Sequence, residues 1–126
     1  MAESGIEGGC LCGALRWRAV GPPRWVAFCH CASCRRATGA PVTAYAGFAR
    51  EQVMWSRGEP RYHASSEGVR RGFCPTCGTP LTYEGARWPD EVHLHLGTLD
   101  DPERLVPTDH AFAEERLGWL KLEGLP

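Results

Sequence analysis

The stretch Phe73-Cys74-Pro75-Thr76-Cys77-Gly78 carries the strongest structural signal in the sequence. Two cysteines separated by two residues form a knuckle, in which both thiolates can bind one metal ion while backbone N–H groups point at the sulfurs. Glycine after the second cysteine relieves crowding where the backbone turns back. One knuckle supplies two ligands, whereas structural zinc takes four in a tetrahedron. The other two ligands must come from elsewhere in the chain.

A second pair of cysteines lies near the start, in Gly9-Cys10-Leu11-Cys12-Gly13, and it is likewise flanked by glycines. Joining it to the knuckle would tie an N-terminal hairpin to a hairpin far along the chain. We therefore predict a closed structural zinc site formed by Cys10, Cys12, Cys74 and Cys77. The alternative is that one pair consists only of buried thiols.

The middle cluster, Cys29-x-Cys31-x-x-Cys34, uses all the remaining cysteines. Its three thiolates can bind one zinc ion at a strand-to-helix turn and leave the fourth coordination position open. Three protein ligands with an exchangeable fourth is the pattern of catalytic zinc, so we assign the catalytic role to this cluster. Two alternatives are a structural site closed by a distant histidine and three free thiols without metal.

The type of ligand indicates the chemistry of the middle cluster. Three thiolates outweigh the charge of zinc and weaken its Lewis acidity, which makes the activation of water less favourable. Holding an incoming thiol as its thiolate suits such a site better, because zinc lowers the pKa of thiols. A small thiol is therefore the expected substrate. Iron is a competing metal for both clusters, although the Cys-x-Cys spacings favour zinc.

The number of cysteines also bears on the compartment. Seven is an odd count, which a secreted disulfide framework would not normally show. The first residues, MAESGIEGG, have neither the basic nor the apolar region of a signal peptide, and no run of about eighteen apolar residues occurs. We expect a cytoplasmic protein with reduced thiols and no membrane partner.

Composition favours a single globular domain over residues 1–126. Apolar residues make up 43% of the chain and charged residues 23%, which is ordinary for a folded domain. The net charge of -1 does not favour a nucleic-acid partner. Arg35-Arg36 and Arg70-Arg71 are local positive doublets, which are usually solvated surface.

Short apolar or alternating segments, separated by many glycines and prolines, predict a mainly β fold. One short helix is expected at Ser33–Thr38, after the middle cysteines, ended by Gly39. The residues from Asp109 to Leu122 mix helical and extended character and have no assignment. The expected strands are 14–20, 25–29, 42–48, 53–56, 61–64, 69–73, 81–83 and 92–96, the last of them half buried.

The histidines carry weaker signals. His30 lies between two proposed ligands, so its side chain should point away from their metal ion. His93 and His95 share one face of a strand, where solvent-facing or hydrogen-bonded histidines are the common outcome and a ligand or acid–base role is the alternative. His63 and His110 have no local pattern around them.

Taken together, these motifs resemble the glutathione-dependent formaldehyde-activating enzyme family, which also contains centromere protein V. The resemblance covers roughly Gly8 to Leu122. It implies a β-tent fold of small antiparallel sheets, a structural zinc at Cys10, Cys12, Cys74 and Cys77, and a functional zinc at Cys29, Cys31 and Cys34. It also implies addition of glutathione to formaldehyde, a reaction classed with the carbon–sulfur lyases. The matching residues are Gly9 to Ala14, Cys29 to Gly39, Phe73 to Gly78, Gly97 to Pro102, His110 and Trp119.

Two classes of function follow. In the first, the protein is an enzyme acting on a small thiol adduct, and Arg35 or Arg36 pairs with a carboxylate of a glutathione-like thiol. In the second, it is a non-catalytic zinc module that binds a partner. A binding module has no need of an open coordination position, so the three-cysteine cluster favours the enzyme.

Overall fold

The structure, a computed structural model, describes residues 5–125 and is mainly β with one short helix, as the sequence predicted. The strands are β1 (Gly5–Gly9), β2 (Arg16–Val20), β3 (Trp25–Cys29), β4 (Thr43–Ala49), β5 (Val53–Arg57), β6 (Arg61–Ser66), β7 (Val69–Phe73), β8 (Pro80–Gly85), β9 (Glu91–His95) and β10 (Asp109–Ala111). The helix is α1 (Ala32–Thr38), and the 3₁₀ turns are η1 (Arg50–Gln52), η2 (Leu96–Thr98), η3 (Pro102–Arg104) and η4 (Ala113–Glu115).

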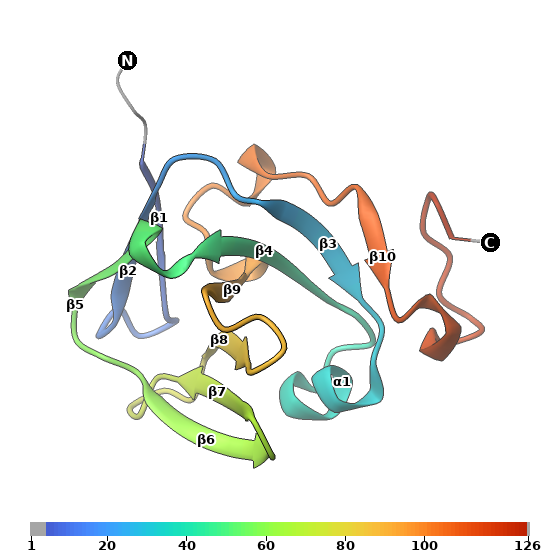
Figure 1. Ribbon diagram of the computed structural model, residues 1–126, viewed down its shortest axis with the longest axis horizontal. Helices are drawn as coiled ribbons and strands as arrows, with labels where there is room; N and C mark the ends of the chain where they lie inside the picture. The colour runs from blue at the N-terminus through green and yellow to red at the C-terminus, as the bar shows by residue number, and fades with distance from the viewer. Residues whose placement is uncertain (1–4, 126) are drawn as a thin grey trace.

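The strands form two sheets (Figure 1). A three-stranded sheet has the order β1-β2-β5, and a seven-stranded sheet has the order β10-β3-β4-β9-β8-β7-β6. Neighbouring strands are antiparallel, except that β10 pairs parallel with β3. That exception brings the C-terminal part of the chain beside the strand that ends at the first cysteine of the middle cluster (Figure 1).

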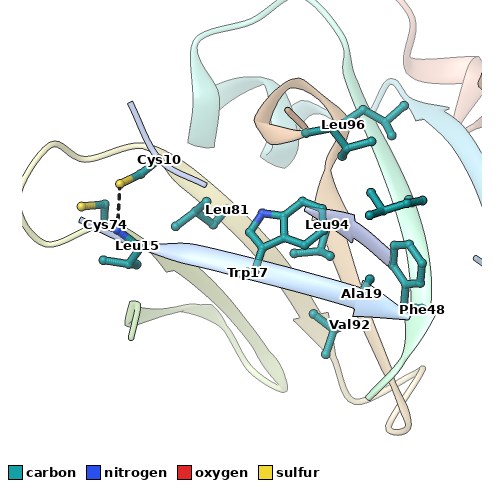
Figure 2. Close-up of a cluster of buried hydrophobic side chains, with 13 residues drawn as sticks. Cys10, Leu15, Trp17, Ala19, Phe48, Cys74, Leu81, Val92, Leu94 and Leu96 are labelled. Carbon is teal, nitrogen blue, oxygen red and sulfur yellow. Dashed lines mark hydrogen bonds between the residues drawn. The ribbon is translucent and has the colours of Figure 1, made fainter. Parts of the chain in front are cut away.

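The hydrophobic core lies where one face of the seven-stranded sheet meets the smaller sheet. Trp17 from β2 is fully buried among Phe48, Leu81 and Leu94 from the larger sheet (Figure 2). Each such side chain contributes about 1.5–3 kcal/mol when it leaves water. Cys10 and Cys74 lie at one end of this cluster, so the four-cysteine site continues the core (Figure 2).

The sequence predicted the helix and most strands to within a few residues. Strand β2 lies within the predicted segment 14–20, and α1 ends before Gly39, whose backbone N–H donates to Arg35 O. Strand β1 was missed, because a segment with three glycines in five residues has low strand propensity. One of them, Gly8, packs directly against the Trp17 indole, where a Cβ atom would overlap the ring.

The prediction that residues 92–96 are half buried was wrong. All five residues of β9 are buried, as is Leu96. Val92 and Leu94 face the core, while His93 and His95 lie on the opposite face of a central strand, beneath other side chains of the sheet. Apolar and polar residues do alternate in this strand, but His93 and His95, at its polar positions, are covered by aromatic side chains and do not face solvent.

The segment that had no assignment, from Asp109 to Leu122, contains β10 and η4, and its remainder lacks regular structure. Among residues 5–125, no helix is both long enough and apolar enough to cross a bilayer.

Gly47 in β4 is required by the way Trp25 packs. The two residues are directly opposite in the β3–β4 ladder, and the Trp25 indole lies across the Gly47 backbone, so that a Cβ atom would overlap the ring. From there Trp25 Nε1 donates to Glu91 Oε1 at 3.3 Å. Glycine at this position therefore fixes the indole over the sheet face opposite the core.

We expect Gly47→Ala to lower the free energy of unfolding by about 1–3 kcal/mol, because the indole must move to relieve the overlap. The Trp25 Nε1–H resonance should also shift as its hydrogen bond to Glu91 is lost. Urea denaturation and NMR would measure the two effects. Gly118→Ala is the matched control, since a Cβ atom there meets open space. Equal stability of the two variants, with an unchanged Trp25 resonance, would contradict this packing.

Candidate metal centres and the cleft beside them

The four-cysteine cluster joins two turns that are far apart in the sequence. Cys10 and Cys12 follow β1, Cys74 and Cys77 follow β7, and their four Sγ atoms lie within 4.8 Å of one another. The Cys10–Cys12 and Cys12–Cys74 sulfur distances are 3.7 and 3.8 Å. Sulfurs bound tetrahedrally at about 2.3 Å from zinc would be about 3.8 Å apart, so the cluster could hold such an ion.

Backbone groups of both turns are directed at the sulfurs. Leu15 N donates to Cys10 Sγ at 3.3 Å, and Thr76 N and Cys77 N donate to Cys74 Sγ at 3.4 Å. Gly13 and Gly78, one after each cysteine pair, both have φ of 83°, a conformation that favours glycine. Hydrogen bonds from N–H groups favour the thiolate form, which is the form that binds metal.

The three-cysteine cluster lies where β3 passes into α1. Cys29 is the last residue of β3, Cys31 is the N-cap of α1 and Cys34 is in its first turn. Their Sγ atoms lie within 4.8 Å of one another, and Cys29 and Cys34 are 3.8 Å apart. Within residues 5–125, no histidine, carboxylate or further cysteine joins this group. It could therefore hold a metal ion through three protein ligands.

His30 does not contribute to the cluster, as predicted. Its ring is fully buried, and its Nε2 lies 3.0 Å from His110 Nδ1. The two rings stack with centroids 5.2 Å apart. His30 therefore holds the C-terminal segment against β3 and does not serve as a ligand.

Cys34 is the most strongly stabilised thiolate of the cluster. Its Sγ accepts hydrogen bonds from Cys29 Sγ at 3.8 Å, from the Tyr45 hydroxyl at 3.3 Å and from Arg71 Nη1 at 3.7 Å. Chiefly through Cys29, with Tyr45, Cys31 and Arg71 adding to it, these contacts lower the pKa of Cys34 to about 4 against the effect of burial. Burial raises the pKa of Tyr45, so its hydroxyl keeps the proton that it donates.

A cleft of about 500 Å³ opens beside these sulfurs. Register explains how it forms, because alternate residues of neighbouring strands share one face of the sheet. Ala27 pairs with Tyr45 across β3 and β4, and Tyr83 pairs with both His93 and Arg71 across β8. All five line the cleft, on the sheet face opposite the core.

Glu91 organises the far wall of the cleft. Its Oε1 accepts from His93 Nε2 at 2.9 Å and from Trp25 Nε1 at 3.3 Å, and its Oε2 pairs with Arg24 at 3.2 Å. Burial lowers the pKa of His93, and the Glu91 carboxylate only partly opposes this, so the ring is neutral at pH 7. Since Nε2 carries the proton donated to Glu91, Nδ1 is left as an acceptor.

Arg35 and Arg36, the predicted substrate contacts, lie outside the lining of this cleft. Arg36 lines a second cleft of about 480 Å³ together with His63. Both clefts are lined by Ser33, Ser66 and Arg71, so they meet beside the helix. The structure therefore separates the two arginines, with Arg36 near a shared passage and Arg35 in neither cleft lining.

Several residues around the cysteines were not found by sequence reasoning. Arg71 was noted only as half of a charged doublet, and Tyr45, Tyr83 and Trp88 were not singled out. Alternation within each strand gives the side on which these residues lie, but only the pairing order brings them together. The sequence carried no signal for that order.

The chain also matches known proteins. Residues 5–115 match the family described as glutathione-dependent formaldehyde-activating enzyme. A Halomonas elongata protein named "Putative glutathione-dependent formaldehyde-activating enzyme" is 31% identical over 131 residues, which cover 94% of this chain and 81% of that protein. The chain belongs to this family.

Two further comparisons extend the match. A Schizosaccharomyces pombe protein named as an uncharacterized lyase is 34% identical over 77 residues, which cover 61% of this chain and 56% of that protein. The crystal structure of a Rhodobacter sphaeroides protein has a TM-score of 0.66 and 23% identity, with 83% of this chain and 99% of that chain covered. The latter likeness shows a shared fold.

We expect Tyr45→Phe to weaken zinc binding at the three-cysteine cluster by about 10–100-fold, the usual effect of removing a group that hydrogen-bonds a ligand. The lost hydrogen bond raises the pKa of Cys34 toward its ordinary value, so at neutral pH more of the thiol competes as its protonated form. Competition with a chromogenic chelator measures the affinity. Tyr62→Phe is the control, because Tyr62 lies on β6 and lines a different cavity, to which none of the cysteines contributes. Equal affinities in the two variants would exclude the role of Tyr45.

Proposed function

We propose that this protein is a zinc-dependent enzyme of the carbon–sulfur lyase type that acts on a small thiol adduct, with glutathione and formaldehyde as the substrate pair. The observation that carries the proposal is the three-cysteine cluster, which has no fourth protein ligand among residues 5–125 and opens into a cleft. The family and the names of its relatives support the same reaction.

Two zinc ions per chain belong to the proposal. One would be structural at Cys10, Cys12, Cys74 and Cys77, and the other functional at Cys29, Cys31 and Cys34. Their sulfur distances suit tetrahedral zinc, and all seven cysteines are free thiols, which suits a reducing compartment such as the cytoplasm. We propose that the chain acts there as one domain, with neither nucleic acid nor a membrane as partner.

When bound, the functional zinc would supply an open coordination position that lowers the pKa of an incoming thiol. The protein's own residues complete the site. Arg71 and Tyr45 stabilise the negative charge on Cys34. The thiol sulfur adds to the carbonyl carbon, the C=O electron pair moves to oxygen, and that oxygen takes up one proton. His93 lines the cleft with its Nδ1 free to accept, and we propose that Nδ1 takes the proton that the thiol loses and passes it to this oxygen.

The carboxylates of the thiol are assigned to the second cleft. Arg36 and His63 line it, and it reaches the sulfur cluster through Ser33, Ser66 and Arg71. A thiol with its sulfur at the cluster could therefore extend an anionic end toward Arg36. Arg35, in neither lining, is assigned a supporting positive charge on the same helix.

The experiment is exchange NMR of glutathione with formaldehyde, where the protein should speed equilibration beyond the spontaneous rate. Cys31→Ser, which loses the functional zinc, should give only that spontaneous rate. Thiol binding by calorimetry should strengthen as pH rises toward the free thiol pKa, because coordination releases a proton. Wild type and Cys31→Ser giving the same exchange rate, with no thiol binding, would exclude the enzyme and favour a zinc module.

The same assay tests the anionic end of the thiol. Glutathione should bind more tightly than a neutral thiol of similar size. Arg36→Met should reduce this ratio of affinities by roughly fivefold, which corresponds to the loss of an exposed ion pair of about 1 kcal/mol. Added salt should reduce the ratio as well. Arg61→Met, an exposed arginine on β6, is the control and should leave the ratio unchanged. If the two arginine variants behave alike, the carboxylates bind elsewhere.

A further inference from the structure

The cleft beside the three cysteines has a wall built of aromatic rings. His93 stacks on Tyr83 with centroids 5.5 Å apart, meets Trp25 edge-on at 4.6 Å and meets Trp88 at 5.4 Å. Tyr83 and Trp88 are themselves 6.3 Å apart. All four residues line the cleft, so planar apolar faces border much of its volume.

Phe112 adds a further ring to the lining of this cleft. Its φ of 55° makes it the only non-glycine residue with a left-handed backbone among residues 5–125, and the residue is 39% exposed. Such a conformation is costly for a phenylalanine, and residues of this kind concentrate at binding sites. The strained backbone of Phe112 therefore holds an apolar ring in the lining of the cleft.

The charges around the cleft disfavour an anion. Arg71 already contacts Cys34 Sγ, and its guanidinium lies 5.0 Å from the Tyr83 ring centroid. Asp109 and Glu115, the carboxylates in the lining, come from the C-terminal segment. Glu115 accepts from Ala32 N at 2.9 Å, which fixes its position beside the helix. A neutral occupant suits these surroundings better than a carboxylate does.

Formaldehyde does not account for this wall. It has one carbon and almost no apolar surface to bury, whereas a cleft of about 500 Å³ is the size that encloses a small organic ligand. The anionic part of the thiol has the second cleft, where Arg36 and His63 lie. The aromatic cleft is therefore left for the group on the other side of the new carbon–sulfur bond.

We propose that, besides formaldehyde, this protein accepts an aldehyde carrying a neutral aromatic substituent, and that this substituent lies against Trp25, Tyr83 and Trp88. The inference rests on the proposed function, because the same cluster of Cys29, Cys31 and Cys34 is the reaction centre. The thiol sulfur forms a bond to the aldehyde carbon, the C=O π pair moves to oxygen, and the proton lost by the thiol is matched by the one gained there. No redox partner or leaving group is needed.

The test compares 3-phenylpropanal with propanal, which have nearly identical carbonyl groups and differ by one phenyl ring. In exchange NMR with glutathione, the protein should accelerate hemithioacetal formation from 3-phenylpropanal at least tenfold more than that from propanal or formaldehyde. The anionic analogue 3-(4-carboxyphenyl)propanal should show little of this extra acceleration over propanal. Trp88→Ala should narrow the ratio between phenylpropanal and propanal, whereas Trp119→Ala, an exposed residue outside the cleft, should leave it unchanged.

A second readout does not depend on the reaction. The alcohol 3-phenylpropan-1-ol should bind at least tenfold more tightly than propan-1-ol and shift the indole Nε1–H resonances of Trp25 and Trp88. If the phenyl compounds gain nothing over the propyl compounds while formaldehyde is still converted, the inference is overturned and the proposed function stands. If the phenyl alcohol binds but no aldehyde exchange is accelerated, the proposed function and the aldehyde assignment both fall.

Discussion

Four thiols converge from two turns that are distant in the sequence, with Cys12 and Cys74 separated by 62 residues yet 3.8 Å apart at sulfur. One turn belongs to the three-stranded sheet and the other to the seven-stranded sheet, so the cluster joins the two layers at the end of the core. A metal ion bound there would contribute on the order of 10 kcal/mol, comparable with the whole stability of a small domain. Strand β7 ends and strand β8 begins at the turn that carries Cys74 and Cys77. The positions of Arg71 on β7 and Tyr83 on β8 in the cleft therefore depend on this turn.

The two faces of the seven-stranded sheet have different roles: one packs into the hydrophobic core and the other carries the cleft beside the three cysteines. On β9, Val92 and Leu94 pack into the core while His93 and His95 face the other side. Burial on that second face keeps the histidines neutral, lowering the pKa of His95 to about 4. The same face carries the aromatic wall, and the cysteines at the end of β3 open onto it. A polar reaction centre can therefore stand on a sheet whose opposite face is a conventional hydrophobic core.

Local patterns predicted what depends on local chemistry. The cysteine spacings indicated both clusters, the glycines after each pair indicated the turns, and His30 was placed away from the metal because of its position between ligands. What could not be predicted depends on contacts between distant strands. Strand β1 has low propensity and is held by its pairing with β2 and by the fit of Gly8 against Trp17. Arg71 on β7 and Tyr45 on β4 meet Cys34 only because of the strand order β4-β9-β8-β7, and no single segment encodes that order.

The central claim is that the seven cysteines form two unlike metal sites, one that stabilises the fold and one that is open to substrate. Native mass spectrometry of the zinc-loaded protein tests it most directly, because the technique reports bound metal and folding together. We predict two zinc ions on a folded wild-type chain, one zinc on a folded Cys31→Ser chain, and an unfolded charge distribution for Cys74→Ser. A wild-type chain with a single zinc ion, or equal unfolding of both variants, would contradict the division into two sites.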